Sequence, residues 1–215
     1  IYHDFSAEEE ALPPMPVVTP AKQDLQQLAA LLNDGDSITI LCGSGCAGAH
    51  DELLALSERL KAPVVHALRG KEHVEWDNPY DVGMTGLIGF SCGYHAILDC
   101  DVLLMLGTDF PYQQFYPDNA KVIQVDIRGR NLGRRTPIEM GLVGSVRDTL
   151  AALQPSLRQK QQRQHLDKSL NHYRKTRKRL DELAVNDRDR TPIRPEYVAG
   201  LTNRLASDDA VFTVD

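Results

Sequence analysis

Glycines and cations that could bind a phosphate stand out in two places. The first is GSGCAG, residues 43–48, whose G-x-G-x-x-G spacing follows an apolar run and precedes a helical pattern. There, unpaired backbone N–H groups and the positive end of a helix dipole attract a phosphate. The second is residues 67–94, where four glycines would let the backbone approach a flat or anionic ligand, and Arg69 and Lys71 supply positive charge. Both patterns are suited to a ligand that carries phosphate.

Both patterns also have a purely structural interpretation. The glycines of residues 43–48 could serve only close packing of a strand against a helix. A dinucleotide site usually has an acid at the end of the second strand, but here that strand ends in Val65, His66 and Ala67. Residues 67–94 could be a surface excursion held by its own side chains. The glycine motif therefore favours a Rossmann-like unit more strongly than it favours NAD.

Two later apolar runs end in residues suited to ligand binding. DVLLMLG, residues 101–107, is followed by Thr108, Asp109, Phe110, Pro111 and Tyr112, and KVIQVD, residues 121–126, ends in Asp126. The carboxyl ends of parallel strands form the ligand-binding edge of open α/β sheets. Asp126 could accept hydrogen bonds from a ribose or an adenine, or it could cap the next turn.

Strand and helix patterns alternate through the first 153 residues. We predict buried strands at 37–42, 63–66, 101–107, 121–126 and 141–144, and helices at 50–60 and 91–99. A further helix is predicted to begin with Thr19 as N-cap and Pro20 at its first position, and Ser145 should cap one that runs to Leu153. Residues 67–90 show little periodicity and are expected to form a long loop. The alternation predicts an α/β fold with a doubly wound parallel sheet.

The two ends of the chain differ from this pattern. Residues 1–18 are acidic and proline-rich, which predicts a linker. Residues 157–183 are polar and basic, which favours a solvated helix between domains; binding to a membrane surface or to nucleic acid is the less favoured alternative. Prolines then interrupt the helix, a short helix is expected at 195–205, and residues 210–215 form an unpaired strand pattern. Because the chain lacks an initial Met and ends in this pattern, we expect it to be a segment of a larger protein.

Composition excludes several classes of function. A net charge of −6 argues against general nucleic-acid binding. No apolar run approaches the roughly 18 residues needed to span a bilayer. The four cysteines lack zinc-ribbon spacing, which fits a reduced cytoplasmic compartment. We find no Ser/His/Asp order, no paired-carboxylate cleft and no metal-ligand cluster, so neither catalytic nor metal-binding residues are expected in this segment.

Four stretches resemble the central domain of the thiamine-diphosphate-dependent pyruvate oxidases, and especially of the bacterial quinone-dependent pyruvate dehydrogenases. The resemblance covers nearly the whole chain. Its most specific part is residues 67–94, because no general fold rule requires that string. The stretches are GSGCAGAH, VVHALRGKEHVEWDNPYDVGMTGLIGFSCGYH, LLMLGTDFPYQQFYP and KVIQVDI.

The resemblance implies a six-stranded, Rossmann-like parallel sheet that holds FAD between two other domains. It divides the chain into a linker from an upstream domain (1–18), a central FAD-binding domain (19–153), a helical connector (154–192) and the start of a thiamine-diphosphate-binding domain (193–215). The implied FAD contacts are Thr85, Gly86, Leu87, Ile88, Thr108, Asp109, Phe110, Pro111, Tyr112 and Asp126, with Gly43, Gly45 and Arg69 as further candidates. Asp109 and residues 128–130 depart from the family pattern, so the details of the contacts with the adenine end of FAD need not match those of the family.

The implied reaction converts pyruvate, a quinone and water to acetate, CO₂ and quinol. Thiamine diphosphate and Mg²⁺ would be held by the flanking domains, so the segment by itself is expected to be inactive. The resemblance further implies a homo-oligomer, a homotetramer in the family, that is cytoplasmic and peripheral on the inner face of the cell membrane. It implies no nucleic-acid partner.

Two other functions stay open. In the first, the protein is a thiamine-diphosphate decarboxylase or synthase without redox chemistry, and its middle domain is a spacer or a nucleotide site. In the second, the chain is a free-standing NAD- or nucleotide-binding module, against which the unpaired strand pattern at residues 210–215 argues.

Overall fold

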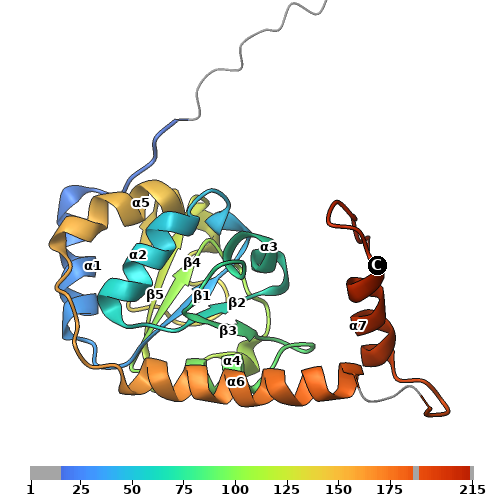
Figure 1. The fold of residues 1–215 in the computed structure, drawn as a ribbon. Helices are drawn as coiled ribbons and strands as arrows, with labels where there is room; N and C mark the ends of the chain where they lie inside the picture. The colour runs from blue at the N-terminus through green and yellow to red at the C-terminus, as the bar shows by residue number, and fades with distance from the viewer. Residues whose placement is uncertain (1–15, 186–188, 214–215) are drawn as a thin grey trace, which may run out of the picture.

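A single parallel sheet of six strands organises the protein (Figure 1). The structure is a computed structural model that describes residues 16–185 and 189–213. The strand order is β3-β2-β1-β4-β5-β6, the order of the Rossmann fold, and every neighbouring pair is parallel. This confirms the predicted α/β class and doubly wound sheet. The strands are β1 (Ile38–Cys42), β2 (Val64–His66), β3 (Asp81–Met84), β4 (Val102–Leu106), β5 (Lys121–Asp126) and β6 (Met140–Val143).

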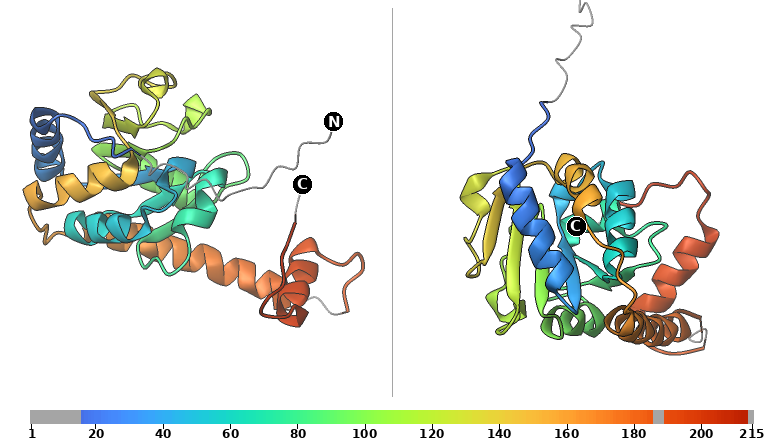
Figure 2. Two further views of the ribbon diagram at one scale, coloured as in Figure 1. Left: turned by 90° about the horizontal axis from the view of Figure 1, so that it is seen from above. Right: turned by 90° about the vertical axis from the view of Figure 1, so that its left-hand side faces the viewer.

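Helices cover both faces of the sheet, as the views in Figure 2 show. Helices α1, α2 and α5 pack on one face, and α4 with the first half of α6 packs on the other. The helices are α1 (Lys22–Asp34), α2 (His50–Leu60), α3 (Lys71–Val74), α4 (Ser91–Leu98), α5 (Val146–Leu153), α6 (Gln164–Val185) and α7 (Pro195–Leu205). No helix in the described part of the chain is both long and apolar enough to cross a membrane.

The central strand β4 shows why the sheet is buried on both faces. Its five residues are all buried, and alternate side chains enter opposite cores. Leu104 and Leu106 join the core under α1, α2 and α5, whereas Leu103 and Met105 join the core under α4 and α6. A continuous apolar run is therefore what a central parallel strand requires.

The ends of two helices test the capping predictions. Ser145 is the N-cap of α5, and its hydroxyl accepts a hydrogen bond from Asp148 N at 3.2 Å, as predicted. The prediction that Thr19 caps the first helix is wrong, because α1 begins at Lys22 with Ala21 as its N-cap. The carbonyl of Val18 accepts a hydrogen bond from Ser145 N, so this contact draws the chain before α1 toward α5.

The prediction of a long loop after β2 is wrong in part, because these residues contain the short helix α3 and the edge strand β3. This strand has only four residues, DVGM, and two of them are aspartate and glycine, which are rare in strands. It pairs only with β2, and the register shifts between the pairs at Val64 and His66. A short, irregular edge strand of this kind leaves almost no period-two signal in a sequence.

The interpretation of residues 157–183 as a solvated bridging helix is also partly wrong. Helix α6 begins at Gln164, and its first half buries Leu166 and Leu170 in the core that contains Ile97. Residues 157–163 are not helical; the backbone N–H of Lys160 donates to Arg59 O at the end of α2. Beyond Leu170, α6 is mostly exposed and extends past the sheet to α7 (Figure 2).

The chain ends agree only in part with the predictions. Helix α7 occupies the expected residues 195–205. Residues 210–213 form no strand, contrary to the strand expected at 210–215, whose last two residues lie outside the described part. The proposed linker lies outside it too, except for residues 16–18.

Candidate functional site

Two of the segments predicted to bind the cofactor lie against each other at the carboxyl edge of the sheet. Gly86 follows β3 with φ of +111°, a conformation that favours glycine. A Cβ added there would lie 3.4 Å from Cε2 of Phe110 and 3.6 Å from Cε2 of Tyr112. Residues 85–88 and 108–112 are thus neighbours, although residues 89–107 separate them in the sequence.

Thr85 is the buried polar residue at this junction. Its side chain is 3% exposed, and its Oγ1 has no hydrogen-bond partner among the described residues, whereas its backbone N–H donates to His66 O. A buried hydroxyl is normally hydrogen-bonded, so an unpaired one requires an explanation. The next two side chains differ from it, since Leu87 is 67% exposed and Ile88 is 70% exposed. A buried hydroxyl beside exposed apolar groups suits an amphipathic ligand such as a flavin.

The segment after β4 is a rigid aromatic turn. Phe110 makes edge-on contacts with the rings of Tyr112 and Tyr116, and the Tyr116 hydroxyl donates to Phe110 O at 2.7 Å. Thr108 is buried, and its carbonyl accepts a hydrogen bond from the side chain of Gln124. Pro111 is exposed. These contacts fix the turn independently of any ligand.

The glycines of the G-x-G-x-x-G motif pack against the neighbouring chain. A Cβ on Gly43 would lie 2.5 Å from Gly107 O, and one on Gly45 would lie 2.6 Å from Gly107 Cα. The backbone N–H of Gly45 donates to Gly107 O at 3.0 Å. This close approach fills the space between the ends of β1 and β4, where the strand order reverses and dinucleotides usually bind. The observed contacts support the packing interpretation of the motif.

Asp126 stabilises the turn that follows β5. It is 4% exposed; one carboxylate oxygen accepts from Arg128 N at 2.8 Å and the other from the Asn131 amide at 3.0 Å. These are the contacts of the capping alternative. Carboxylate oxygens have further lone pairs, so a ligand contact by Asp126 stays a prediction.

The two remaining charged candidates differ in their surroundings. Asp109 is held by Arg134 at 2.9 Å and by Arg135 at 2.8 Å. The hydrogen bonds that the Arg135 guanidinium donates to Asp109, and the negative charge of that carboxylate, raise the pKa of Arg135. Arg69 lies on the exposed turn after β2 and forms no ion pair among the described residues. Arg69 is therefore the candidate whose charge is available to a phosphate.

The fold also assembles a cluster that we did not find in the sequence. His66 at the end of β2, Glu75 after α3 and Asp81 at the start of β3 place one ligating atom each within 4.8 Å of one another. The contact with His66 is the main cause that lowers the pKa of Glu75 to about 2, and burial raises the pKa of Asp81 to about 6. Only pairing of β2 with β3 brings the first and last of these residues together.

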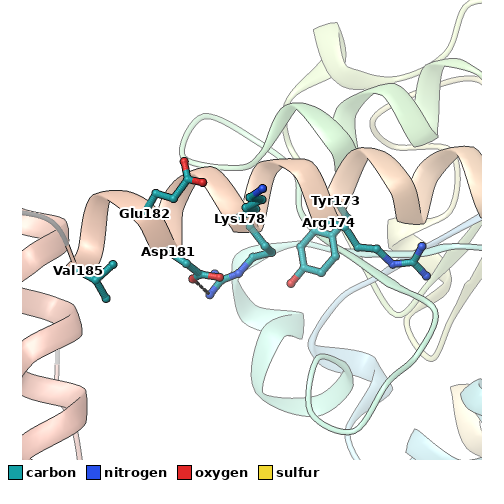
Figure 3. A pocket seen from close by; sticks show the side chains of 7 residues that line it. Tyr173, Arg174, Lys178, Asp181, Glu182 and Val185 are labelled. Carbon is teal, nitrogen blue, oxygen red and sulfur yellow. Dashed lines mark hydrogen bonds and ion pairs between the residues drawn. The ribbon is translucent and has the colours of Figure 1, made fainter.

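A separate hollow of about 480 Å³ lies along α6 between Tyr173 and Val185 (Figure 3). Its lining comes entirely from this helix, and most of the side chains are charged and point outward. None of the predicted cofactor contacts lines it. The lining residues are Tyr173, Arg174, Arg177, Lys178, Asp181, Glu182 and Val185.

The four cysteines are expected to resist alkylation in the folded protein. All are free and buried; burial raises the pKa of Cys42 and Cys92 and raises that of Cys100 to about 12. The thiolate is the reactive form, so iodoacetamide at pH 8 should leave these four unlabelled until the chain is unfolded. Mass spectrometry of the tryptic peptides provides the measurement. Complete labelling of any of them within minutes under native conditions would contradict the burial described above.

Comparison with known proteins identifies the domain. Residues 25–153 match the family model described as "Thiamine pyrophosphate enzyme, central domain". The chain is 62% identical over 177 residues to an "Uncharacterized 42.6 kDa protein in isoamylase 3'region" of Pseudomonas amyloderamosa, an alignment that covers 82% of this chain and 45% of that protein.

Two further relatives carry functional names. The chain is 33% identical over 197 residues to the "Putative thiamine pyrophosphate-containing protein YdaP" of Bacillus subtilis (strain 168), covering 91% of this chain and 34% of that protein. It is 24% identical over 199 residues to a pyruvate oxidase of Lactiplantibacillus plantarum, covering 91% of this chain and 33% of that protein. Proteins named as acetolactate synthases also match.

The chain therefore spans less than half the length of these relatives. The family match covers all six strands, and it runs from within α1 to the end of α5. This chain belongs to the thiamine pyrophosphate enzyme family and contains its central domain.

Proposed function

We propose that this chain is the FAD-binding part of a thiamine-diphosphate-dependent pyruvate oxidase that passes electrons to a membrane quinone. The observation that carries the proposal is the junction of residues 85–88 and 108–112 around the unpaired hydroxyl of Thr85. The name of the Lactiplantibacillus plantarum relative supports pyruvate as the substrate.

The residues at the junction fit a flavin cofactor. Thr85 would donate or accept a hydrogen bond, Gly86 would allow the backbone to approach closely, and Leu87 and Ile88 would cover an apolar part of the cofactor. Thr108 through Tyr112 would form the opposite wall, with Asp109 and Pro111 at its open side. Asp126, Gly43, Gly45 and Arg69 complete the proposed contacts, Arg69 through a phosphate. Bound FAD would carry two electrons from pyruvate to the acceptor.

The remaining parts of the reaction belong to the proposal as well. Thiamine diphosphate and Mg²⁺ would be held by domains before and after this one, with residues 1–18 and 154–192 as connections and residues 193–215 as the start of the latter. The protein would be a homo-oligomer at the inner face of the membrane, where the quinone is available. This chain would position the flavin and exclude water from it.

The absorption spectrum of the full-length protein tests the proposal. We expect the purified protein to be yellow with the two visible bands of oxidised flavin, and to bleach when pyruvate is added without oxygen in the presence of thiamine diphosphate and Mg²⁺. Omission of thiamine diphosphate is the control and should prevent the bleaching. A colourless protein that still consumes pyruvate would refute the redox function.

One observation favours a second candidate, a decarboxylase or synthase without redox chemistry. Both oxygens of Asp126 already accept hydrogen bonds, and the glycine motif is closed by Gly107, so neither needs a ligand. The acetolactate synthases among the relatives are consistent with this candidate. Formation of acetolactate from pyruvate, with no electron acceptor required, would establish it.

A further inference from the structure

We infer that His66, Glu75 and Asp81 form a site for a divalent cation of the zinc type. The inference is separate from the flavin proposal, because it rests on other side chains. It starts from two buried polar groups that lack partners.

The first observation is the state of His66. Its side chain is fully buried, and neither ring nitrogen has a hydrogen bond among the described residues. Its Nε2 nevertheless lies 3.1 Å from Glu75 Oε2 and 3.5 Å from Asp81 Oδ1. Asp81 is 4% exposed, and its Oδ1 also lacks a hydrogen-bond donor. The three potential ligand atoms therefore lie close together, although no hydrogen bond with acceptable geometry satisfies His66 Nε2 or Asp81 Oδ1.

The second observation is the spacing of these atoms. Zinc bonds of about 2.0–2.2 Å to nitrogen and oxygen place the ligand atoms of a tetrahedron roughly 3.3–3.5 Å apart. The two separations from Nε2 are 3.1 and 3.5 Å, and all three atoms lie within 4.8 Å of one another. The two separations that involve His66 Nε2 therefore match a tetrahedral ion to within a few tenths of an ångström, and three protein ligands would leave a fourth position for water.

Charge and access also favour a cation. A neutral imidazole and two carboxylates carry two negative charges, and burial of such charges without compensation is unfavourable. The Glu75 side chain is 35% exposed, which provides an entry path. Lys71 pairs with Glu75 from the solvent side, and its own side chain is 52% exposed. Lys71 is thus a competitor for Glu75.

Three elements would be joined by the ion. His66 ends β2, Glu75 follows α3, and Asp81 starts β3, whose register with β2 shifts between Val64 and His66. The second carboxylate oxygen of Asp81 accepts a hydrogen bond from Gly83 N at 3.1 Å, which orients the group. A bound cation would therefore fasten the irregular edge strand to the sheet.

Zinc titration of the full-length protein, first stripped of metal with a chelator, tests the inference by calorimetry. The wild type should bind one more equivalent of zinc than either His66→Gln or Asp81→Asn. A metal site elsewhere in the protein would contribute equally to all three proteins, so it would not affect this difference. His50→Gln is the matched control, because His50 is also buried but lies outside the cluster. Lys71→Ala keeps all three ligands and should bind zinc about two- to fivefold more tightly.

A second measurement does not depend on substitutions. Crystals of the wild-type protein soaked in zinc should show an anomalous difference peak within bonding distance of the three ligand atoms. Absence of the peak, or equal zinc stoichiometry in the wild type and both ligand variants, would overturn the inference. Those results would assign the cluster to a histidine that is simply paired with two carboxylates.

Discussion

Replacement of Gly107 by alanine should destabilise the sheet domain by about 2–5 kcal/mol, the sum of a left-handed backbone penalty of about 1–2 and an overpacking penalty of about 1–3. Gly107 has φ of +55°, and a Cβ there would lie 2.5 Å from Gly45 Cα. Backbone atoms cannot rotate away as a side chain can, so the ends of β1 and β4 would have to separate.

The control for this prediction is Gly48, which lies in the glycine motif against which Gly107 packs. Gly48 has φ of +71°, but nothing lies within 4 Å of a Cβ added to it. Gly48→Ala should therefore cost only the backbone penalty of about 1–2 kcal/mol. Urea unfolding followed by circular dichroism measures both variants. Equal midpoints for the two variants would show that the contact between Gly45 and Gly107 contributes little.

Replacement of Thr85 by valine should have opposite effects on stability and on flavin affinity. Without flavin, the variant loses a buried hydroxyl that has no partner, so the free energy of unfolding should rise by up to about 1 kcal/mol. With flavin, the variant cannot form the proposed hydrogen bond, so the dissociation constant for FAD should rise about tenfold. Thermal unfolding and fluorescence titration of the full-length protein with FAD measure the two effects.

Thr149→Val provides the matched control for Thr85. Thr149 is also buried with an unpaired hydroxyl, but it lies in α5, on the face of the sheet opposite α4. Its replacement should stabilise the protein to a similar degree and leave the affinity for FAD unchanged. If both variants retain wild-type affinity for FAD, Thr85 does not contact the cofactor. The main structural argument for the proposed function would then fail.

Most of the sheet could be predicted because burial on both faces leaves a strong local signal. The run that became β4 is continuous and apolar, those of β1 and β5 are rich in β-branched residues, and the two helical patterns at 50–60 and 91–99 match α2 and α4 closely. The Ser145 cap followed from one residue type at a helix start. Such features depend on residues that are neighbours in the sequence, so they can be predicted from the sequence alone.

The errors occurred where distant contacts outweigh local preference. Thr19 and Pro20 have good helix-start chemistry, yet the hydrogen bond between Val18 and Ser145 keeps the chain extended until Ala21. Strand β3 exists because β2 offers it an edge, despite its poor composition. Residues Leu166 and Leu170 appeared to be isolated apolar groups in a polar helix, and only packing against α4 shows that they belong to the core.

For the candidate site, too, some features follow from the local sequence and others depend on distant contacts. The sequence by itself determined which segments end at the carboxyl edge of the sheet, because alternating strands and helices permit only a parallel, right-handed arrangement. Only the tertiary structure decided how those ends meet: Gly86 against Phe110, Gly45 against Gly107, and His66 beside Asp81. The physical reason is that hydrophobic periodicity is encoded locally, whereas the spacing between loop atoms depends on strand register and on close packing of the whole domain.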